Sequence, residues 1–573
     1  MKMIRKNMLK ITLGFVALAF PMMVAAQVSK HVEVTKAYIP EVPEAVKLPI
    51  EPNMVDTVKM RPEIDYSISP KMYSTSLATH SFQPVTVTYW EFNRPKNFYI
   101  KAGAGYPFNS IGDAYASIHN TRVGYLMAYL NHRGQYAELR NHNHELTTAM
   151  QLQNKVGVAG GLYCGKRIFE GNVNYNTEMY HRHAGDGSKI EFEDMEAKLR
   201  FGDNFTDLSR VNFDITVVGD SFNDKAGWLS EEYKRGLQEA HAGAKARVAR
   251  KFNNHYLELA AGYNGRWGFW DLEDYKNNTA MVGLKYGYKN DLLELMVGAD
   301  YCYDNISARK KASHYLLPQV KVRFKVSQRD LVIPFLEVES ALESNSYHSL
   351  VKRNPYLDFG AVNISMPNTA NYDMRFGVEG RFAKDKFAYR LYAGMQFIEN
   401  SIYWYNYDYM WLRPTLARRN VMSLNLDMDY KPTNKLEISA GLHGYLYSDF
   451  ADIKLGEDKF DIKGGLPPFD AYLKVRYDFG KVAVEASSDF YGVARWSSLE
   501  RIDPKQAPEL SNMNIRTVKT PFYANVNLKV DWQVAEQWSL FLEGSNLANA
   551  HIYQWAWYRE LGIHFTVGAR VNF

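Results

Sequence analysis

The sequence has 573 residues, of which 46% are hydrophobic and 14% aromatic, with 40 tyrosines and a formal net charge of +5. Four of the 68 basic residues lie within the first 26 positions, and removing them leaves 64 bases against 63 acids, so the remainder is nearly neutral. This balance of charge gives no reason to expect nucleic acid as a partner.

The chain begins with the features of an export signal. A basic head precedes an apolar run from Ile11 to Val24, and Val24 and Ala26 occupy the small-residue positions of a cleavage site. These features predict a signal peptide over residues 1–26. Because Gln27 rather than a cysteine follows the cut, a lipid-anchored lipoprotein is not expected. No later apolar stretch is long enough for a membrane-spanning helix.

Residues 27–96 are rich in proline, which occurs at positions 40, 43, 49, 52, 62, 70, 84 and 95. Each proline removes a backbone donor and biases the preceding residue away from helix. The composition predicts an extended periplasmic segment rather than a compact domain.

From residue 97 to the C-terminus, apolar and polar residues alternate in a long series of segments. In the last of them, one face is Ile563, Phe565, Val567, Ala569, Val571 and Phe573, whereas the residues between them are small or polar. This period of two indicates strands with one dry and one wet face. The pattern predicts an all-β fold, a transmembrane antiparallel β-barrel over residues 97–573 whose apolar face contacts outer-membrane lipid.

Charged residues recur on the polar face of several of these strands. So many charges do not fit a protein core, and a polar or water-filled lumen resolves the conflict. We therefore expect six basic side chains to face the lumen: Lys321, Arg323, Lys325, Lys474, Arg476 and Arg570.

The lengths of the connections predict the number of strands. Short polar turns, such as Lys289–Asp291, alternate with longer connections such as Val351–Ala370 and Trp404–Arg419, which is the pattern of bacterial barrels. Counting Glu145–Asn154 as a spanning strand gives 23 strands and places the N-terminal segment outside the cell. Assigning Glu145–Asn154 to an extracellular loop gives 22, with the N-terminal segment in the periplasm. We take the second count.

The C-terminal region carries a recognisable series of residues: Gly544-Ser545-Asn546-Leu547-Ala548-Asn549, then Tyr553, Tyr558, Gly562, Gly568 and Phe573. This series resembles the end of the barrels of TonB-dependent receptors of Gram-negative bacteria. The resemblance implies a 22-stranded barrel in the outer membrane and a role in uptake. Receptors of that family carry a folded plug domain that is longer than residues 27–96, and its glycine-rich motifs do not occur there. We therefore expect a receptor-like barrel without a recognisable plug.

Four histidines form one candidate metal site. His142, His144, His181 and His183 are all expected near the extracellular rim, in pairs that project the same way from a strand. The alternative is that histidine is simply common at polar barrel rims. We favour this alternative and predict no metal or other cofactor.

Aromatic residues in the loops form a candidate ligand-binding surface. They are Trp404, Tyr405, Tyr407, Trp411, Trp267 and Trp270. Aromatic faces beside Asn and Asp suit stacking on sugar rings or hydrophobic ligands. The alternative, which we favour, is the belt of Trp and Tyr at the level of the lipid headgroups.

Three functions remain open. The first is transport or uptake by a plugless receptor-like barrel. The second is a structural or assembly barrel that docks a periplasmic or outer-membrane protein partner, for which an extended proline-rich segment is suited. The third is an outer-membrane hydrolase, but no Ser, His and Asp set occurs at diagnostic spacing, and we do not expect an enzyme. A lumen of 22 strands is too wide for its own side chains to fill. We therefore expect inward-folded extracellular loops, with help from the N-terminal tail, to constrict it.

Overall fold

The computed structural model describes residues 97–573, apart from residues 206, 226–236, 271, 273–274, 308, 310, 327–329, 359–365, 449–450, 456–457, 504 and 507–511. The predicted signal peptide and the predicted periplasmic segment lie outside the described residues. Among the described residues, no helix is both long and apolar enough to cross a membrane.

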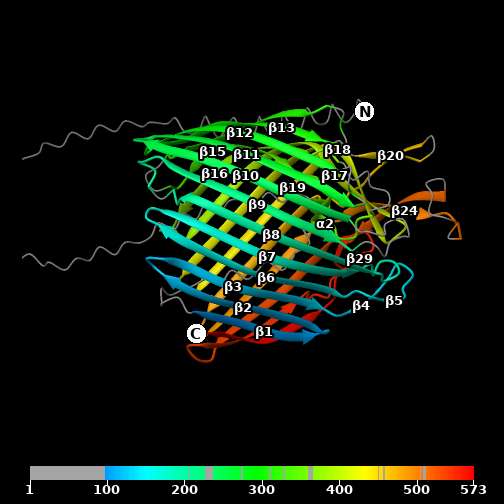
Figure 1. The fold of residues 1–573 in the computed structure, drawn as a ribbon. Helices are drawn as coiled ribbons and strands as arrows, with labels where there is room; N and C mark the ends of the chain where they lie inside the picture. Colours follow the sequence, from blue (N-terminus) through cyan, green and yellow to red (C-terminus); the bar gives the residue numbers. More distant parts are fainter. Residues whose placement is uncertain are drawn as a thin grey trace, which may run out of the picture. The chain divides into compact units, whose positions relative to one another are not determined.

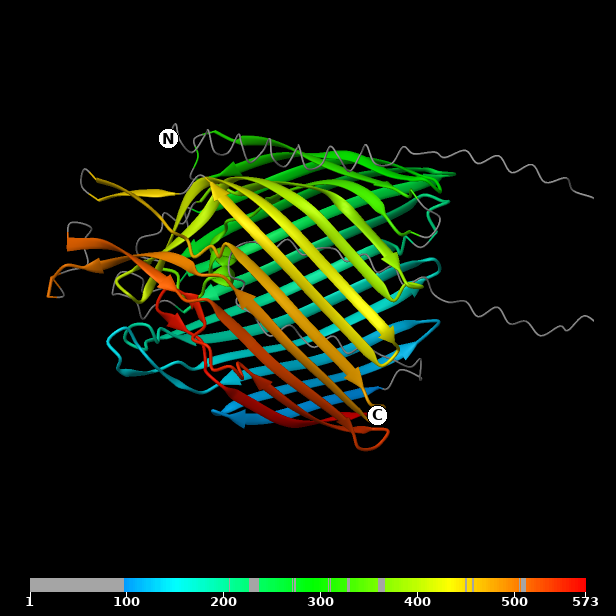
Figure 2. The ribbon, with the colours of Figure 1, turned by 180° about the vertical axis from the view of Figure 1, so that it is seen from behind.

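The described chain forms a β-barrel (Figures 1 and 2). One sheet contains 24 strands, of which β24 (Ala494–Arg501) and β25 (Met513–Thr520) form a hairpin outside the wall, so 22 strands make up the wall itself. The wall strands are β1 (Phe98–Tyr106), β2 (Asn109–Asn120), β3 (Gly124–Gln135), β6 (Gln151–Cys164), β7 (Arg167–His181), β8 (Lys189–Asp203), β9 (Asn212–Asp224), β10 (Leu237–Phe252), β11 (His255–Trp270), β12 (Lys276–Lys289), β13 (Leu293–Ile306), β14 (Ser313–Phe324), β15 (Ile333–Glu343), β16 (Thr369–Phe382), β17 (Phe387–Tyr407), β18 (Trp411–Thr433), β19 (Leu436–Ser448), β22 (Phe469–Asp478), β23 (Val482–Tyr491), β26 (Tyr523–Gln533), β27 (Trp538–Ser545) and β30 (His564–Asn572).

The first and last wall strands close the barrel. β1 pairs antiparallel with β30, with Lys101 opposite Arg570 and Ala104 opposite Val567. Closure satisfies the backbone donors and acceptors that an open sheet edge would leave unpaired in lipid. The predicted count of 22 strands is confirmed.

Side chains alternate between the two faces of the wall as the sequence predicted. On β9, Ile215 and Val217 are about half exposed, whereas Phe222 and Asp224, on the other face, are buried. On β8, Met195 and Leu199 are exposed and Phe192 is buried. The exposed apolar residues identify the outer face of the wall, which suits contact with lipid. The buried face is the inner one.

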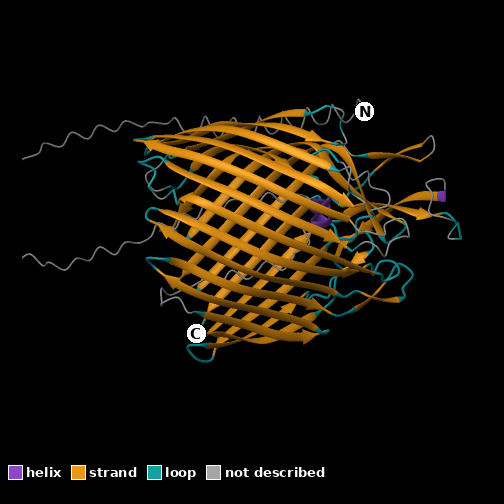
Figure 3. Ribbon diagram, viewed as in Figure 1, coloured by secondary structure: helices purple, strands orange, loops and turns teal. Residues whose placement is uncertain are grey.

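The two ends of the barrel differ (Figure 3). At the turn end, where β1 begins and β30 ends, short turns join the strands, for example between Phe252 and His255. In the described residues, the loop end carries four short hairpins and the helix α2 (Tyr347–Arg353). The hairpins are β4 (Glu138–Arg140) with β5 (Leu146–Thr148), β20 (Asp452–Leu455) with β21 (Asp458–Asp461), β24 with β25, and β28 (Tyr553–Trp555) with β29 (Tyr558–Arg559).

Two predicted connections differ from the structure. Residues 145–154 were expected to lie wholly in a loop; Leu146–Thr148 does, as β5, but residues 151–154 begin the wall strand β6. The predicted long loop Trp404–Arg419 is instead a tight hairpin, because β17 continues to Tyr407 and β18 starts at Trp411. Aromatic and β-branched residues at these positions favour continued strand pairing beyond the level of the neighbouring strands.

Candidate functional site

The connection between β15 and β16 folds into the barrel. Its helix α2 begins at the N-cap Ser346, whose side chain accepts a hydrogen bond from the Ser349 N–H. The Tyr347 hydroxyl donates to Asp224 on β9, and the backbone N–H of His348 donates to Glu239 on β10 at 3.2 Å. In the sheet, β9 and β10 are separated from β15 by β11–β14. The helix therefore lies against the inner face of a distant part of the wall, and the connection crosses the interior to reach it.

The connection between β27 and β30 also turns inward. Asn546 is buried and holds both ends of this connection: its amide group donates to the carbonyl oxygens of Ala550 and Leu561, each at 2.9 Å, and its side-chain oxygen accepts from the Ala550 N–H at 2.8 Å. Within the connection, the ring of Tyr558 stacks on Tyr356 with 3.7 Å between centroids. Two connections from widely separated wall strands thus meet face to face.

A third connection, between β7 and β8, contributes buried basic residues. His183 is 2% exposed, and its Nε2 atom donates to the carbonyl oxygen of Arg559 at 3.0 Å. Burial lowers the pKa of His183 to about 4, so the ring is neutral at pH 7. Arg182 is fully buried, with its guanidinium 4.1 Å from the ring centroid of Trp411, and burial lowers its pKa to about 10.

These connections and the loop-end residues of several strands share one apolar core, here named the loop cluster. Within it, Trp555 makes edge-to-face contacts with Trp404 and Trp496 at 5.8 and 5.6 Å between centroids. The buried members are Tyr180, Ala184, Ile190, Phe192, Phe222, Leu237, Leu272, Tyr275, Tyr347, Leu350, Val351, Tyr356, Leu357, Trp404, Leu412, Trp496, Trp555, Ala556 and Tyr558. Its members come from β7–β10, β17, β18 and β24 and from the connections β7–β8, β11–β12, β15–β16 and β27–β30, so connections from several parts of the wall pack together inside the loop end. Constriction of the lumen by loops and the N-terminal tail stays a prediction, which the inward packing of these connections supports.

A cavity of about 360 Å³ lies between the loop cluster and one side of the wall. Its lining combines aromatic rings with many amides and a few charges: Tyr180, Tyr356, Arg133, Gln135, Gln151, Gln153, Asp489, Asn525, Asn527, Glu543, Gln554, Arg559, Glu560 and His564. A concave site with several convergent polar groups is the usual form of a binding site for a small molecule.

The four histidines considered as metal ligands lie at the loop end. They do not converge on one point, and the contacts of His142 and His181 are with other groups. His142 stacks on Tyr409 at 3.9 Å, and its Nδ1 atom is 2.8 Å from the Ala184 carbonyl oxygen. His144 is exposed, and His181 lies 3.1 Å from the Met150 carbonyl oxygen. In the described part of the chain, the group whose atoms lie close enough to share a metal ion contains none of these four.

The six aromatic candidates divide into two groups. Trp404 and Tyr407 are each 4% exposed, and Tyr405 and Trp411 are partly buried, so these four pack within the inward connections. Arg413 covers the ring of Tyr407 at 3.2 Å. Trp267 and Trp270 lie at the end of β11, and Trp270 is 45% exposed. For Trp404 and Tyr407 the structure shows a packing role that the sequence did not suggest.

Five of the six basic residues expected in the lumen lie beside acids on nearby strands. Lys321 is 3.5 Å from Glu294, Arg323 is 3.2 Å from Glu337, and Lys474 is 3.1 Å from Glu485. Arg570 donates a hydrogen bond to Asp531. In the sheet, Arg476 is paired with Glu437 on one neighbouring strand and with Glu485 on the other. Lys325 directly follows the end of β14.

Sequence reasoning missed the docking site of α2. Asp194, Asp220, Asp224 and Glu239 lie on the inner faces of β8–β10, where the helix packs. The signal available was Ser346, a favourable N-cap ahead of a short helix with Lys352 and Arg353 in its last turn.

No protein-family model and no curated protein matches the chain. Solved structures do. The FrpB iron transporter from Neisseria meningitidis aligns at 11% identity with a TM-score of 0.64, covering 84% of this chain and 82% of that one. The copper transporter OprC aligns at 14% identity and 0.59, covering 84% and 80%. The pyoverdine outer membrane receptor FpvA from Pseudomonas aeruginosa PAO1 aligns at 10% identity and 0.58, covering 84% and 79%. This chain therefore has the 22-stranded fold of these outer-membrane transporters and receptors, as its resemblance to TonB-dependent receptors implied.

Proposed function

We propose that this chain is an outer-membrane uptake barrel in which the loops at the extracellular end, rather than a folded plug, control passage. The observation that carries the proposal is the loop cluster, in which connections from several parts of the wall pack together inside a barrel too wide for its wall side chains to fill. The similar structures include an iron transporter, a copper transporter and a pyoverdine receptor, which supports a role in uptake.

The cavity beside the loop cluster is the proposed binding position for the transported solute. It lies against the wall, where a modest movement of the inward connections would open a path along the inner face. Its amides and aromatic rings suit a polar solute that offers several hydrogen-bonding groups. Catalysis has no part in this proposal.

The inner wall beyond the constriction is proposed to be polar and nearly balanced in charge. The proposal is supported by the pairing of Arg323 with Glu337 and by the exposure of Phe324 on the opposite face of β14. Labelling of single cysteines with a water-soluble reagent tests it: the cysteine at position 323 should react and the one at 322 should not. Preferential labelling at position 322 would refute the register.

The function is tested by deleting residues 27–84. The barrel should remain folded and heat-modifiable on gels, while its conductance rises. Uptake that survives the deletion supports an uptake barrel that needs no TonB-binding segment of its own. Loss of a copurifying protein without any change of permeability would instead indicate the assembly barrel. Residues 31–35 (His31-Val32-Glu33-Val34-Thr35) resemble the energy-coupling box of TonB-dependent receptors. If the deletion abolishes a TonB-dependent uptake activity, and TonB binds a peptide spanning these residues, the chain is a conventional receptor.

A further inference from the structure

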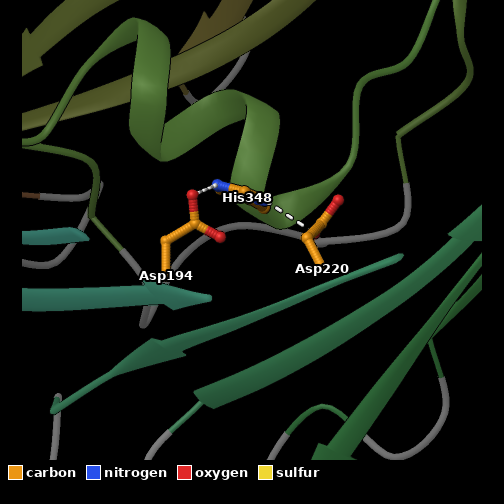
Figure 4. Close-up of side chains that lie close together, drawn as sticks. All are labelled: Asp194, Asp220 and His348. Atoms are coloured by element: carbon orange, nitrogen blue, oxygen red, sulfur yellow. Dashed lines mark hydrogen bonds and ion pairs between the residues drawn. The ribbon is translucent and has the colours of Figure 1, made fainter. Parts of the chain in front are cut away.

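We propose that Asp194, Asp220 and His348 form a binding site for a divalent transition-metal ion, which fixes α2 to the inner wall of the barrel. Asp194 lies on β8, Asp220 on β9 and His348 on α2, so the three residues come from two wall strands and the inward connection (Figure 4). Binding at this site does not depend on which solute the barrel transports.

The three side chains converge around the imidazole ring. His348 Nδ1 lies 3.3 Å from Asp220 Oδ1, and His348 Nε2 lies 3.7 Å from Asp194 Oδ2. One ligand atom from each residue can be chosen so that all three are within 4.8 Å of one another. Bonds of about 2.0–2.2 Å to zinc place neighbouring ligands roughly 3.3–3.6 Å apart in a tetrahedral site. A shift of about 1 Å at the side chains would therefore complete the coordination.

Two buried atoms at this point lack a hydrogen-bond partner. Asp194 and His348 are each 5% exposed, and Asp194 Oδ1 and His348 Nε2 accept or donate no hydrogen bond. Buried polar atoms are nearly always paired, because leaving one unpaired costs about 1–3 kcal/mol. In Figure 4, one oxygen of Asp194 points into the space between the two aspartates, below the imidazole. A cation held between them would satisfy both atoms.

The donor set selects the kind of ion. One imidazole nitrogen with two carboxylate oxygens suits zinc and its neighbours better than calcium or magnesium, which prefer oxygen alone. Three protein ligands leave a position for water, as in other three-ligand zinc sites. The remaining contacts of Asp220 would orient the site: His241 Nδ1 lies 2.5 Å from its Oδ2 atom, as expected for an outer partner of a metal ligand.

Arg266 Nη1 lies 4.0 Å from Asp220 Oδ1. The cation that competes at Asp194 is Lys352. Its Nζ atom lies 3.0 Å from Asp194 Oδ2, but its side chain is 49% exposed and is free to leave. Zinc and this ammonium group therefore compete for the same carboxylate. The competition gives the site a signature that a purely structural histidine would lack, because removing the lysine should strengthen metal binding.

The barrel contains a matched control. His443 also lies between two aspartates, 3.1 Å from Asp427 and 2.7 Å from Asp470. Both of its nitrogens are hydrogen-bonded to those carboxylates, so no unpaired donor or acceptor remains there. Replacing His443 removes the same chemical group without touching α2.

The experiment measures zinc binding to the full chain in detergent by isothermal titration calorimetry, with magnesium as the comparison ion. Heat-modifiability on gels confirms that each variant is folded. We expect one zinc per chain, binding at least tenfold weaker in His348→Gln and Asp194→Asn, unchanged binding in His443→Gln, and tighter binding in Lys352→Met. Cleavage by trypsin after Arg353 provides a second readout, and zinc should slow it in the unmodified chain but not in His348→Gln.

Equal zinc affinity in His348→Gln and His443→Gln would overturn the proposal. So would weaker binding in Lys352→Met, or cleavage after Arg353 that zinc does not slow. If uptake fails but zinc binds as described, the proposed function is wrong and the metal site stands.

Discussion

Removing the indole of Trp555 should open the constriction. Trp555 is 1% exposed and makes edge-to-face contacts with Trp404 and Trp496. Truncating a buried Trp to Ala costs about 3–5 kcal/mol, through lost transfer free energy and the cavity left behind. Because Trp555 lies in an inward connection rather than in the wall, its truncation should destabilise the packing of the loop cluster and not the wall. A change of about 4 kcal/mol multiplies the population of the open form roughly a thousandfold.

The assay is conductance in planar lipid bilayers. Trp555→Ala should show frequent large openings that the unmodified chain lacks. The control is Trp538→Ala, which removes the same atoms from a side chain that is 51% exposed at the turn end. Both variants should remain heat-modifiable, since the wall is intact. Equal conductance in Trp555→Ala and Trp538→Ala would refute the idea that the loop cluster closes the barrel.

Three further predictions concern other parts of the structure. Burial depresses the pKa of His183 from its usual 6.5 to about 4, so the stability of the loop cluster should be full above pH 6.5 and fall by about 3 kcal/mol as the pH drops from 6.5 to 4. Proteolysis of the inward connections should therefore accelerate over that range, and His183→Phe should flatten the dependence. Val567→Arg places a charge on a side chain that is 58% exposed on the outer face, which should cost roughly 2–4 kcal/mol near the midplane and lower the yield of folding into lipid vesicles, whereas Val567→Leu should not. Asn546→Ala removes three hydrogen bonds that hold the β27–β30 connection and should speed amide exchange over residues 550–561 without altering exchange in β30; unchanged exchange would contradict the holding role.

The wall could be predicted from the sequence because its determinants are local. Phe565, Val567 and Ala569 alternate with polar residues, and that alternation alone assigns each side chain to a face. The strand count followed from the spacing of turns, and it was correct although residues 151–154 were wrongly assigned to a loop. Each wall strand can be predicted from its own alternation of apolar and polar residues and from the turns on either side of it.

The sequence led us to expect inward-folded loops but did not show which residues would meet. The contacts of the loop cluster join segments that are far apart in the chain. Tyr356 stacks on Tyr558, and Tyr347 bonds Asp224, and no periodic pattern relates the members of either pair. For the same reason Trp404 was interpreted as part of a surface belt or a ligand surface, whereas it is buried in the loop cluster. An aromatic residue in a barrel loop has the same local sequence whether it faces lipid, ligand or another loop.

The same limit applied to the histidines. His142, His144, His181 and His183 stood out because they are close in sequence, whereas His348 was passed over although it lies between Asp194 and Asp220. Pairs of histidines spaced by one residue show which way the rings project, not what stands opposite them. The carboxylates that surround His348 lie on strands more than one hundred residues earlier in the chain.

The most direct test of the account replaces residues 346–366 with a short Gly-Ser linker and compares single-channel conductance with that of the unmodified full chain. Glu343 and Thr369 are paired neighbours in the sheet, so a short linker joins β15 to β16 without disturbing the wall. The replacement removes α2 and Tyr356 from the loop cluster. We expect low conductance for the unmodified chain and a large, steady conductance for the variant. A large conductance in the unmodified chain, or a variant that stays closed, would contradict closure of the barrel by its loops.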